Sequence, residues 1–478
     1  MRYAAPFLTA ATRQLAALLA TSAAVHADVT LAPPFQDHAV LQAGERVPIW
    51  GLADPGERVR VTFAGQTPVE AVAGSDGQWR AELPVLSASA VPAELVVEGR
   101  NRIVARDVLV GEVWLCSGQS NMDRGLARFS GTAADIAAAD FPAIRQLRVA
   151  RNPAAAPQDT AVAAWSVCSP ATAPEISAVG FYFARDLWRA RGVPVGLIVS
   201  THGDTPIEAW VSADALAGAP EFGVVAQRWA QAITLPAVKR YQAPSGLYNG
   251  MIHPLVPYAL RGFLWYQGES NAARAAEYAR LFPELIRTWR HAFGQNDAPF
   301  FWVQLPNLRE REMPPGTTAA DWVALRAAQT AALALPATGQ AVTIDVGDPD
   351  NIHPPRKREV AERLARLARR QVHGEAIQDR GPEPAAVSAE GDTVRVRFDP
   401  RGGRPELRGD GAAALELAGG DGVFVPATTV ALDRENLVVR AAGITAPVAI
   451  RYAWRADPTA VIFNDAGLPA APFQRPVQ

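Results

Sequence analysis

The chain has 478 residues, of which 49% are hydrophobic and 20% charged, and its formal net charge at pH 7 is -2. This composition is typical of a globular protein with two or three domains. Acidic and basic residues are interspersed, which predicts neither a nucleic acid nor a membrane surface as a partner. Beyond the N-terminal segment, no stretch approaches the roughly 20 apolar residues needed to span a bilayer.

Residues 1–27 have the pattern of a signal peptide. Arg2 precedes a mainly apolar run from Leu15 to Val25, and small residues lead to Ala27. Cleavage after Ala27 predicts an exported protein, periplasmic or secreted. Arg13 interrupts the start of this segment, and a short amphipathic helix is the alternative.

Residues 28–106 show the period-two pattern of β-strands. Val59, Val61 and Phe63 alternate with polar residues, which indicates one buried and one exposed face. The turn sequence DPG precedes them at 54–56. We predict a small N-terminal β-sandwich domain that contains no reactive cluster.

Residues 107–375 change character, because apolar strand-like runs now alternate with helical stretches. Apolar residues recur at helical spacing within 272–293, and another helix is expected after Pro355. Strands alternating with helices predict an α/β domain whose largely parallel sheet is covered on both faces. The predicted strands are Ile144–Val149, Val195–Ser200, Gly262–Tyr266, Phe300–Leu305 and Ala341–Asp345.

Residues 376–478 return to the strand pattern. Apolar residues alternate with polar ones at 393–398 and again at 448–452. We predict a C-terminal β domain. The pattern leaves open whether this domain stands alone or completes the N-terminal sandwich.

The stretch 108–122, VLVGEVWLCSGQSNM, joins a buried strand to a sharp polar end. An almost continuous apolar run predicts the strand, and small polar residues follow it. Ligands of open α/β sheets bind at the carboxyl ends of the strands, so Ser120 lies where a nucleophile is needed. The alternative is that Ser120 caps the next helix.

A nucleophilic serine needs a base within hydrogen-bond reach and a third group that orients the base. His353 follows a predicted strand and precedes a helix, a more suitable context than those of His202 and His253. Asp350, three residues earlier, could turn back and accept a hydrogen bond from Nδ1–H of His353. An acidic turn that begins a helix is the alternative.

Two further polar loops follow apolar strands. One reads THGDTP at 201–206, and the other reads WYQGESN at 265–271. Glycine N–H groups and amide side chains in such loops are suitable donors to a tetrahedral oxyanion. Four polar loops at strand ends favour one catalytic site over four unrelated caps.

Cys116 and Cys168 are the only cysteines. An exported protein could pair them, but the apolar strand around Cys116 equally fits a buried free thiol. The sequence contains no CxxC, no HExxH and no histidine cluster, so we predict no metal site.

Five motifs together resemble one known family. GEVWLCSGQSNM, GDTPIEAW, LYNGMIHPL, WYQGESNA and DNIHP occur in the order found in the sialate O-acetylesterase-like carbohydrate esterases of the SGNH hydrolase superfamily. The resemblance covers nearly all of the chain after the signal peptide. It implies a flavodoxin-like α/β catalytic domain with a parallel sheet, flanked by N- and C-terminal β domains, and no cofactor.

The resemblance assigns catalytic roles to individual residues. Ser120 corresponds to the nucleophile and His353 to the base. Asp350 fits the DxxH pattern of the acid, but the acid varies in position among relatives, and Asp348 competes with it.

The resemblance also implies an oxyanion hole formed by the backbone N–H groups of Ser120 and Gly203 and by the Gln267 side chain. Asn271 is the alternative amide. Relatives often have glycine where Asp204 stands, so this loop departs from the family pattern.

Glu269, Asn271 and Trp210 are candidate substrate-binding residues. A sugar hydroxyl could bind to Glu269, and Trp210 could line an acetyl pocket. Buried structural hydrogen bonding of Glu269 and core packing of Trp210 are the alternatives.

The family acts on O-acetylated sugars, which implies a serine esterase with 9-O-acetyl sialic acid as its first candidate substrate. Acetylated plant polysaccharide, xylan or xyloglucan, is an alternative, and we expect specificity to lie in 212–244. A non-catalytic carbohydrate-binding protein is the second alternative, which the presence of Ser120, Asp350 and His353 disfavours. No nucleic-acid or membrane partner is expected, and the sequence does not indicate an oligomeric state.

Overall fold

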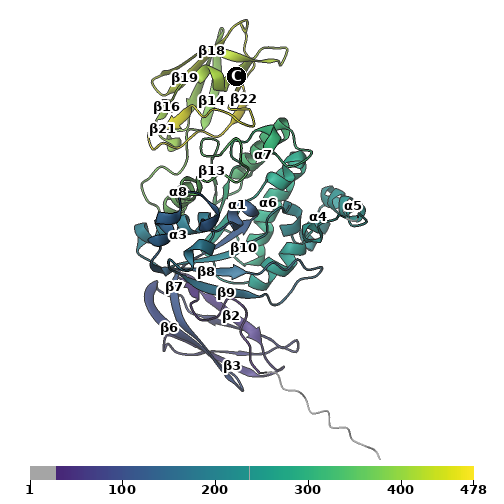
Figure 1. The fold of residues 1–478 in the computed structure, drawn as a ribbon, viewed down its shortest axis with the longest axis vertical. Coiled ribbons are helices and arrows are strands. Elements are labelled where there is room, and N and C mark those ends of the chain that lie inside the picture. Colours follow the sequence, from purple (N-terminus) through teal and green to yellow (C-terminus); the bar gives the residue numbers. More distant parts are fainter. Residues whose placement is uncertain (1–27, 236) are drawn as a thin grey trace, which may run out of the picture.

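The computed structural model describes residues 28–235 and 237–478. The predicted signal peptide, 1–27, therefore lies outside the described residues. The described chain forms three bodies in a row along the long axis of the molecule (Figure 1). N-terminal strands lie at one end, a sheet covered by helices lies in the middle, and C-terminal strands lie at the other end.

Six strands build most of the N-terminal body. β2 pairs with β5, whereas β3 pairs with β4 and β6. Alternate residues of β3 and β5 are buried, in agreement with the period-two pattern of the sequence. The strands are β1 (Val40–Gln42), β2 (Val47–Leu52), β3 (Arg58–Phe63), β4 (Val69–Val72), β5 (Gln78–Leu83) and β6 (Ser89–Glu98).

Strand β7 (Arg102–Gly118) joins the N-terminal body to the central body without a linker. Its first half pairs antiparallel with β6, and its second half pairs in parallel with two strands of the central sheet. The predicted boundary between residues 106 and 107 thus falls inside one continuous strand. The N-terminal and central bodies therefore share this strand, and no linker separates them there.

The central sheet is mixed, with six parallel strands and one antiparallel edge strand, β9. Its order is β13 (Thr338–Ala341), β12 (Phe300–Val303), β11 (Gly262–Tyr266), β7, β10 (Val195–Thr201), β8 (Phe141–Val149) and β9 (Ala163–Cys168). β7 and β11 are neighbours in the middle of the sheet. The polar loops that follow these two strands are therefore flanked by the loops that follow β10 and β12.

The predicted strand Ala341–Asp345 is misplaced, because β13 ends at Ala341. Ile344 is buried in the core of the C-terminal strands, whereas Val346 is buried in the core of the central body. The alternation of apolar residues here reflects burial on two sides of a turn rather than a strand.

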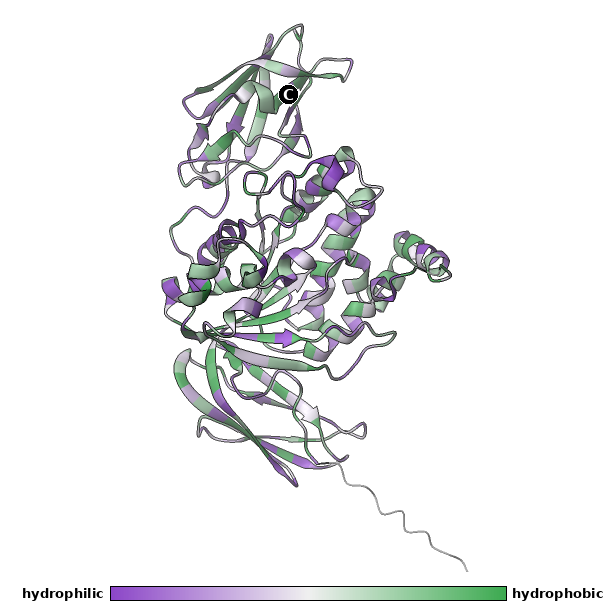
Figure 2. Ribbon diagram, in the orientation of Figure 1, coloured by the Kyte–Doolittle hydropathy of each residue, from purple (hydrophilic) through white to green (hydrophobic). Residues whose placement is uncertain are grey.

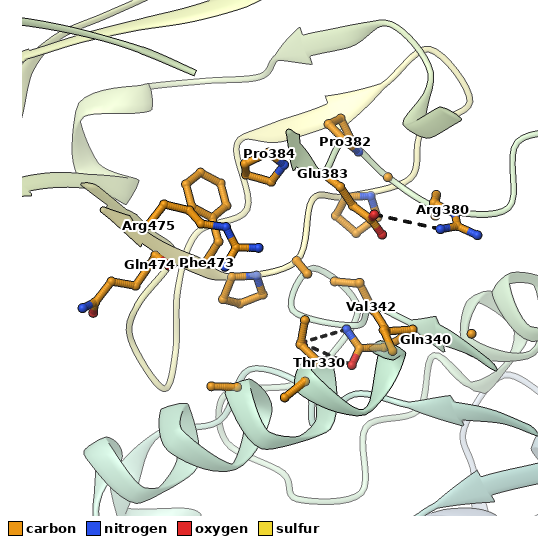
Figure 3. A pocket seen from close by; sticks show the side chains of 18 of the residues that line it. Thr330, Gln340, Val342, Arg380, Pro382, Glu383, Pro384, Phe473, Gln474 and Arg475 are labelled. Atoms are coloured by element: carbon orange, nitrogen blue, oxygen red, sulfur yellow. Dashed lines mark hydrogen bonds and ion pairs between the residues drawn. The ribbon is translucent and has the colours of Figure 1, made fainter. Parts of the chain in front are cut away.

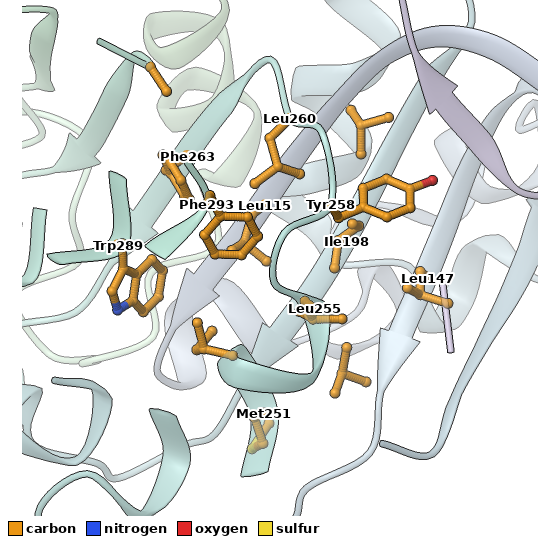
Figure 4. Close-up of a cluster of buried hydrophobic side chains, with 14 of the residues drawn as sticks. Leu115, Leu147, Ile198, Met251, Leu255, Tyr258, Leu260, Phe263, Trp289 and Phe293 are labelled. Atoms are coloured by element: carbon orange, nitrogen blue, oxygen red, sulfur yellow. The ribbon is translucent and has the colours of Figure 1, made fainter. Parts of the chain in front are cut away.

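Helices cover both faces of the central sheet. α3 (Ala178–Arg191) and α8 (Lys357–Leu367) pack on the face that contains Trp114 and Cys116 of β7. α6 (Ala275–Ala292) and α7 (Ala319–Ala331) pack on the opposite face, which contains Leu115. Figure 4 shows part of this second core, and Figure 2 shows hydrophobic residues along the inner strands. The predicted helices at 272–293 and after Pro355 are confirmed as α6 and α8.

Short helices occupy the connections. The α-helices among them are α1 (Ser120–Asp123), α2 (Ala133–Ala137), α4 (Ala213–Gly218) and α5 (Gly223–Ala232), and the others are short 3₁₀ or π segments. α4 and α5 project sideways from the central body (Figure 1). Among residues 28–235 and 237–478, no helix combines the length and apolarity needed to cross a membrane.

The C-terminal strands form a β domain with its own hydrophobic core. The domain lies at the opposite end of the molecule from the N-terminal strands, so it does not complete their sandwich (Figure 1). A sheet of order β14-β15-β19-β18-β17-β20-β22 pairs antiparallel, beside a β16-β21 pair. The strands are β14 (Pro384–Glu390), β15 (Thr393–Phe398), β16 (Pro405–Leu407), β17 (Leu415–Ala418), β18 (Phe424–Asp433), β19 (Asn436–Ala441), β20 (Ala449–Tyr452), β21 (Ile462–Asn464) and β22 (Phe473–Pro476).

A cavity of about 540 Å³ lies between the central body and the C-terminal domain (Figure 3). Thr330 of α7 and Gln340 of β13 line one side, and Phe473 of β22 lines the other. Neither Ser120 nor His353 lines this cavity.

Cys116 and Cys168 are both buried free thiols and form no disulfide. Cys116 lies within β7, and Cys168 ends β9. The free-thiol alternative is therefore the observed one.

Candidate active site

Three polar loops begin at the same level of the central sheet. Gly118 at the end of β7 is in register with Thr201 of β10 and with Tyr266 of β11. A Cβ atom on Gly118 would lie 2.2 Å from the carbonyl oxygen of Tyr266, and the φ angle of Gly118 is +124°. Glycine is therefore required where the chain turns from β7 towards Ser120.

Ser120 is the first residue of α1, and Gln119 occupies the capping position. The hydroxyl of Ser120 lies 2.8 Å from Nε2 of His353. The capping alternative for Ser120 does not hold, because its side chain faces the imidazole instead of the helix backbone.

His353 lies on the loop between β13 and α8 and is partly buried. Burial lowers its pKa to about 4, and the positive charges of Arg124 and Lys357 act in the same direction. At neutral pH the imidazole is therefore uncharged and able to accept the proton of Ser120.

The other two histidines considered have different partners. Nδ1 of His202 donates to the carbonyl of Gly203 at 2.9 Å, and Nδ1 of His253 lies 3.0 Å from the carbonyl of Gln158. Neither histidine takes the position that His353 occupies at Ser120.

The expected hydrogen bond between Asp350 and His353 is not formed. The Asp350 carboxylate accepts hydrogen bonds from Arg309 and Arg311 and is 49% exposed. Asp348 accepts the backbone N–H of Asp350 at 3.0 Å. Within the described part of the chain, no carboxylate accepts a hydrogen bond from His353. The DxxH spacing predicted that Asp350 binds His353, but Arg309 and Arg311 bind the Asp350 carboxylate instead.

Two backbone donors lie at the nucleophile. A Cβ atom on Gly203 would lie 3.5 Å from Cβ of Ser120, so the second loop contacts the first. Among the residues that the structure describes, the N–H groups of Ser120 and Gly203 have no protein acceptor. Both remain able to bind an oxyanion.

The Gln267 side chain supports this region from inside the core. Its Nε2 donates to the carbonyl of Thr205 at 3.1 Å and to Oδ1 of Asn271 at 2.8 Å. Both amide hydrogens of Gln267 are thus engaged, and its side chain is fully buried. The expectation that this side chain donates to the oxyanion is therefore wrong for this structure. Asn271 is equally buried, and it binds the N–H of Ile207 and the carboxylate of Glu208.

Trp210 and Glu269 also lie beneath the site. The indole N–H of Trp210 donates to Oγ1 of Thr205 at 3.0 Å, and Oε1 of Glu269 accepts a hydrogen bond from Asn121 at 2.6 Å. Trp210 is fully buried and Glu269 is 2% exposed. Their positions correct the expected substrate contacts and agree with the core-packing and buried hydrogen-bonding alternatives.

Three residues that sequence analysis did not single out hold the loop of Gly203. Lys239 and the Tyr241 hydroxyl both donate to the Asp204 carboxylate, and Gln242 Nε2 donates to the Asp204 carbonyl at 2.6 Å. Asp204 has a φ angle of +59°, a conformation that costs a non-glycine residue about 1–2 kcal/mol. We call Lys239, Tyr241 and Gln242 the clasp.

Tyr241 makes a second contact with the same loop. Its ring stacks on the imidazole of His202, with centroids 4.4 Å apart and an interplanar angle of 19°. All three residues of the clasp lie within 212–244, the stretch that the sequence analysis expects to carry specificity. The link to Asp204 spans more than 30 residues, however, and no local pattern reveals it.

Comparison with known proteins identifies the family. The model of the family described as "Carbohydrate esterase, sialic acid-specific acetylesterase" matches residues 110–370, more than half of the chain. The chain belongs to this family. The family resemblance of the sequence motifs is thereby confirmed, and the protein is a carbohydrate esterase.

Relatives of this carbohydrate esterase share most of its length. The sialate O-acetylesterase of Homo sapiens is 33% identical over 379 residues, which cover 71% of this chain and 70% of the relative. The sialate O-acetylesterase of Rattus norvegicus is 29% identical over 494 residues, covering 89% and 90%. A solved structure of a carbohydrate acetylesterase from Xanthomonas citri is 38% identical with a TM-score of 0.85, covering 94% of this chain and 99% of that one.

The pH dependence of this esterase should report the low pKa of His353. An imidazole with a pKa of about 4 is neutral above that value, so kcat/KM is expected to be level near neutrality and to fall only as the pH approaches 4. Initial rates with an aryl acetate measure the profile, and near-UV circular dichroism checks folding at each pH. A midpoint close to the ordinary histidine value of about 6.5 would contradict the expectation.

Asp350→Asn tests whether the carboxylate orients His353. Because Asp350 is half exposed and bound to Arg309 and Arg311, we expect kcat to change by less than about threefold. The same substitution of a triad aspartate costs about 10⁴-fold in a serine protease. Asp348→Asn, assayed in parallel, is the matched variant. A loss of about 100-fold or more in either variant would identify that residue as the acid.

Release of the clasp is expected to slow the reaction. Asp204→Ala keeps the strained backbone angle but removes the carboxylate that Lys239 and Tyr241 bind, so the Gly203 loop should lose its position. We expect kcat to fall roughly tenfold, because small displacements of catalytic groups slow the reaction by about this much or more. Asp214→Ala, on the exposed surface of α4, is the control. Equal rates for the two variants would show that the clasp does not matter.

Proposed function

We propose that this carbohydrate esterase is a serine esterase that removes O-acetyl groups through Ser120 and His353. The observation that carries the proposal is the 2.8 Å contact between Oγ of Ser120 and Nε2 of His353 at the carboxyl ends of the central strands. We further propose that the central body is a flavodoxin-like domain of the SGNH type, supported by the order of the motifs on these strands.

In the first half-reaction, Oγ of Ser120 attacks the acetyl carbonyl carbon while His353 takes the hydroxyl proton. The N–H groups of Ser120 and Gly203 bind the resulting oxyanion. The C–O bond to the sugar then breaks, and the imidazolium returns its proton to the departing sugar oxygen. The product is an acetylated Ser120 and a free sugar hydroxyl.

In the second half-reaction, His353 removes a proton from water, and the hydroxide attacks the acetyl-enzyme. Collapse of the second tetrahedral intermediate releases acetate and returns the proton to Ser120. Gln267 and Asn271 contribute by holding the Thr205 backbone and the Ile207 backbone next to the Gly203 loop.

We propose 9-O-acetylated sialic acid as the first substrate to test. This choice is supported by the mammalian relatives, which are sialate O-acetylesterases. We also propose export to the periplasm or the medium, which the signal-peptide pattern at 1–27 supports.

A neutral plant polysaccharide is the second candidate, favoured by a cavity beside the Gly203 loop. The cavity has a volume of about 320 Å³ and lies between Pro206, Trp229 of α5 and Lys239 of the clasp. Its other cations, Arg228 and Arg274, are paired with carboxylates. Paired charges and one indole fit a neutral sugar chain better than the carboxylate of a sialic acid.

The deciding experiment measures acetate released from four substrates: 9-O-acetyl sialic acid, acetylated xylan oligosaccharides, acetylated xyloglucan oligosaccharides and an aryl acetate. Ser120→Ala is expected to lose at least about 10³-fold in kcat on every substrate. Ser117→Ala is the matched control, because its hydroxyl faces away from His353 and donates to the carbonyl of Ser200 on the neighbouring strand β10. It should stay within about threefold of the wild type, since one hydrogen bond contributes roughly 1 kcal/mol to stability.

The pattern of acetate release separates the alternatives. Release from the sialic acid alone would establish the first substrate, and release from the plant oligosaccharides alone would establish the second. Full activity of Ser120→Ala would exclude the serine mechanism. A wild-type protein inactive on all four substrates would point to a carbohydrate-binding protein.

A further inference from the structure

A connected group of buried polar side chains lies directly behind Ser120 and His353. Nζ of Lys357 donates to Oδ1 of Asn121 at 2.6 Å, and Nδ2 of Asn121 donates to Oε1 of Glu269 at 2.6 Å. None of these three side chains is more than 2% exposed. They come from α8, α1 and the loop after β11, three elements far apart in the sequence.

The same amide group also holds the loop of the base. Nδ2 of Asn121 donates a second hydrogen bond, to the carbonyl oxygen of Ile352 at 3.0 Å. Asn121 directly follows Ser120, and Ile352 directly precedes His353. The two hydrogens of one amide therefore connect the helix of the nucleophile to the loop of the base.

Lys357 and Glu269 determine which way the Asn121 amide points. An ammonium group can only donate hydrogen bonds, and a carboxylate can only accept them. A flipped amide would place its N–H₂ against Lys357 and its oxygen against Glu269, and both hydrogen bonds would be lost. The two charges thus keep Nδ2 directed at the carbonyl of Ile352.

The position of Lys357 is costly for stability. It is the first residue of α8, where the helix dipole disfavours a positive charge. Burial lowers its pKa to about 7, although the charge of Glu269 acts in the opposite direction. The rings of Phe129 and Tyr266, 5.0 and 5.1 Å from Nζ, compensate in part. Replacement of buried charges by well-packed apolar residues is often neutral or stabilising, so stability alone does not account for the charge of Lys357.

We propose that Asn121, held in one orientation by Lys357 and Glu269, is the positioning residue that keeps His353 against Ser120. It takes the part that a carboxylate bound to Nδ1 has in a triad, since both nearby aspartates have other partners. This inference rests on the proposed serine-esterase function. Glu269, predicted from the sequence to contact substrate, is thereby assigned to positioning.

Lys357 also acts on the base through its charge. The groups that lower the pKa of His353 beyond burial are Arg124 and Lys357, and those that act on Lys357 are Glu269 and Arg124. Removal of the ammonium therefore raises the pKa of His353. Removal of the Asn121 amide leaves these charges in place. The two substitutions are distinguishable by their pH profiles.

The test compares Asn121→Leu, Asn121→Asp and Lys357→Met with the wild type on an aryl acetate and on the preferred sugar ester. We expect kcat to fall about 10- to 100-fold in each, with KM within about threefold, because misplacement of a catalytic group by about 1 Å costs that much. The acid limb of kcat/KM should move to higher pH in Lys357→Met and stay in place in Asn121→Leu. Asn121→Asp retains the side-chain volume and the acceptor for Lys357 if the leucine variant fails to fold.

Glu112→Gln is the matched control, because Glu112 is another buried carboxylate on β7 and binds Nε2 of His373 at 3.0 Å. We expect Glu112→Gln to leave kcat within about twofold of the wild type. This variant measures the effect of losing a buried charge away from the site. Folded Asn121→Asp and Lys357→Met enzymes with wild-type kcat and an unmoved acid limb would overturn the inference. Ser120→Ala separates the two proposals. If Ser120→Ala abolishes activity while the Asn121 and Lys357 variants keep the wild-type kcat, the serine mechanism stands and the positioning role fails.

Discussion

The hydrogen bond between Ser120 and His353 joins two loops that are 233 residues apart in the sequence. Its formation depends on a sheet whose strands end at one level. Gly118, Thr201 and Tyr266 are register partners, so the polar loops that follow them start side by side. Gly118 then permits the turn that an added Cβ atom would block. Strand register and one glycine thus place the nucleophile.

The chemistry of the site follows from burial and positive charge around the base. Desolvation, Arg124 and Lys357 all disfavour the imidazolium form of His353. Such an imidazole is ready to accept a proton at neutral pH, but it gains less stabilisation when protonated than one paired with a carboxylate. A site of this kind depends on precise placement of the base. The hydrogen bond from Asn121 to the carbonyl of Ile352 holds the residue next to His353 in place.

The loops around the nucleophile are held by side chains from the periphery and from the core. On the outer side, the clasp binds Asp204 and Tyr241 stacks on His202. On the inner side, Gln267 and Trp210 bind Thr205. The Gly203 loop is therefore bound on two sides before any substrate arrives, an arrangement that lowers the reorganisation needed in the transition state.

The sequence by itself determined the inner strands of the central sheet, the helices α6 and α8, the places of Ser120 and His353 in their loops, and the family, whereas β9, α3 and α7 were not predicted from it. These features depend on local periodicity and on short motifs at strand ends, which neighbouring residues specify. The tertiary structure alone decided the partners of polar side chains. Asp350 binds arginines some 40 residues away, and Gln267 points into the core, because either direction is open to a side chain at a strand end. The shared strand β7 likewise has no local signal, since pairing on its two halves involves distant segments.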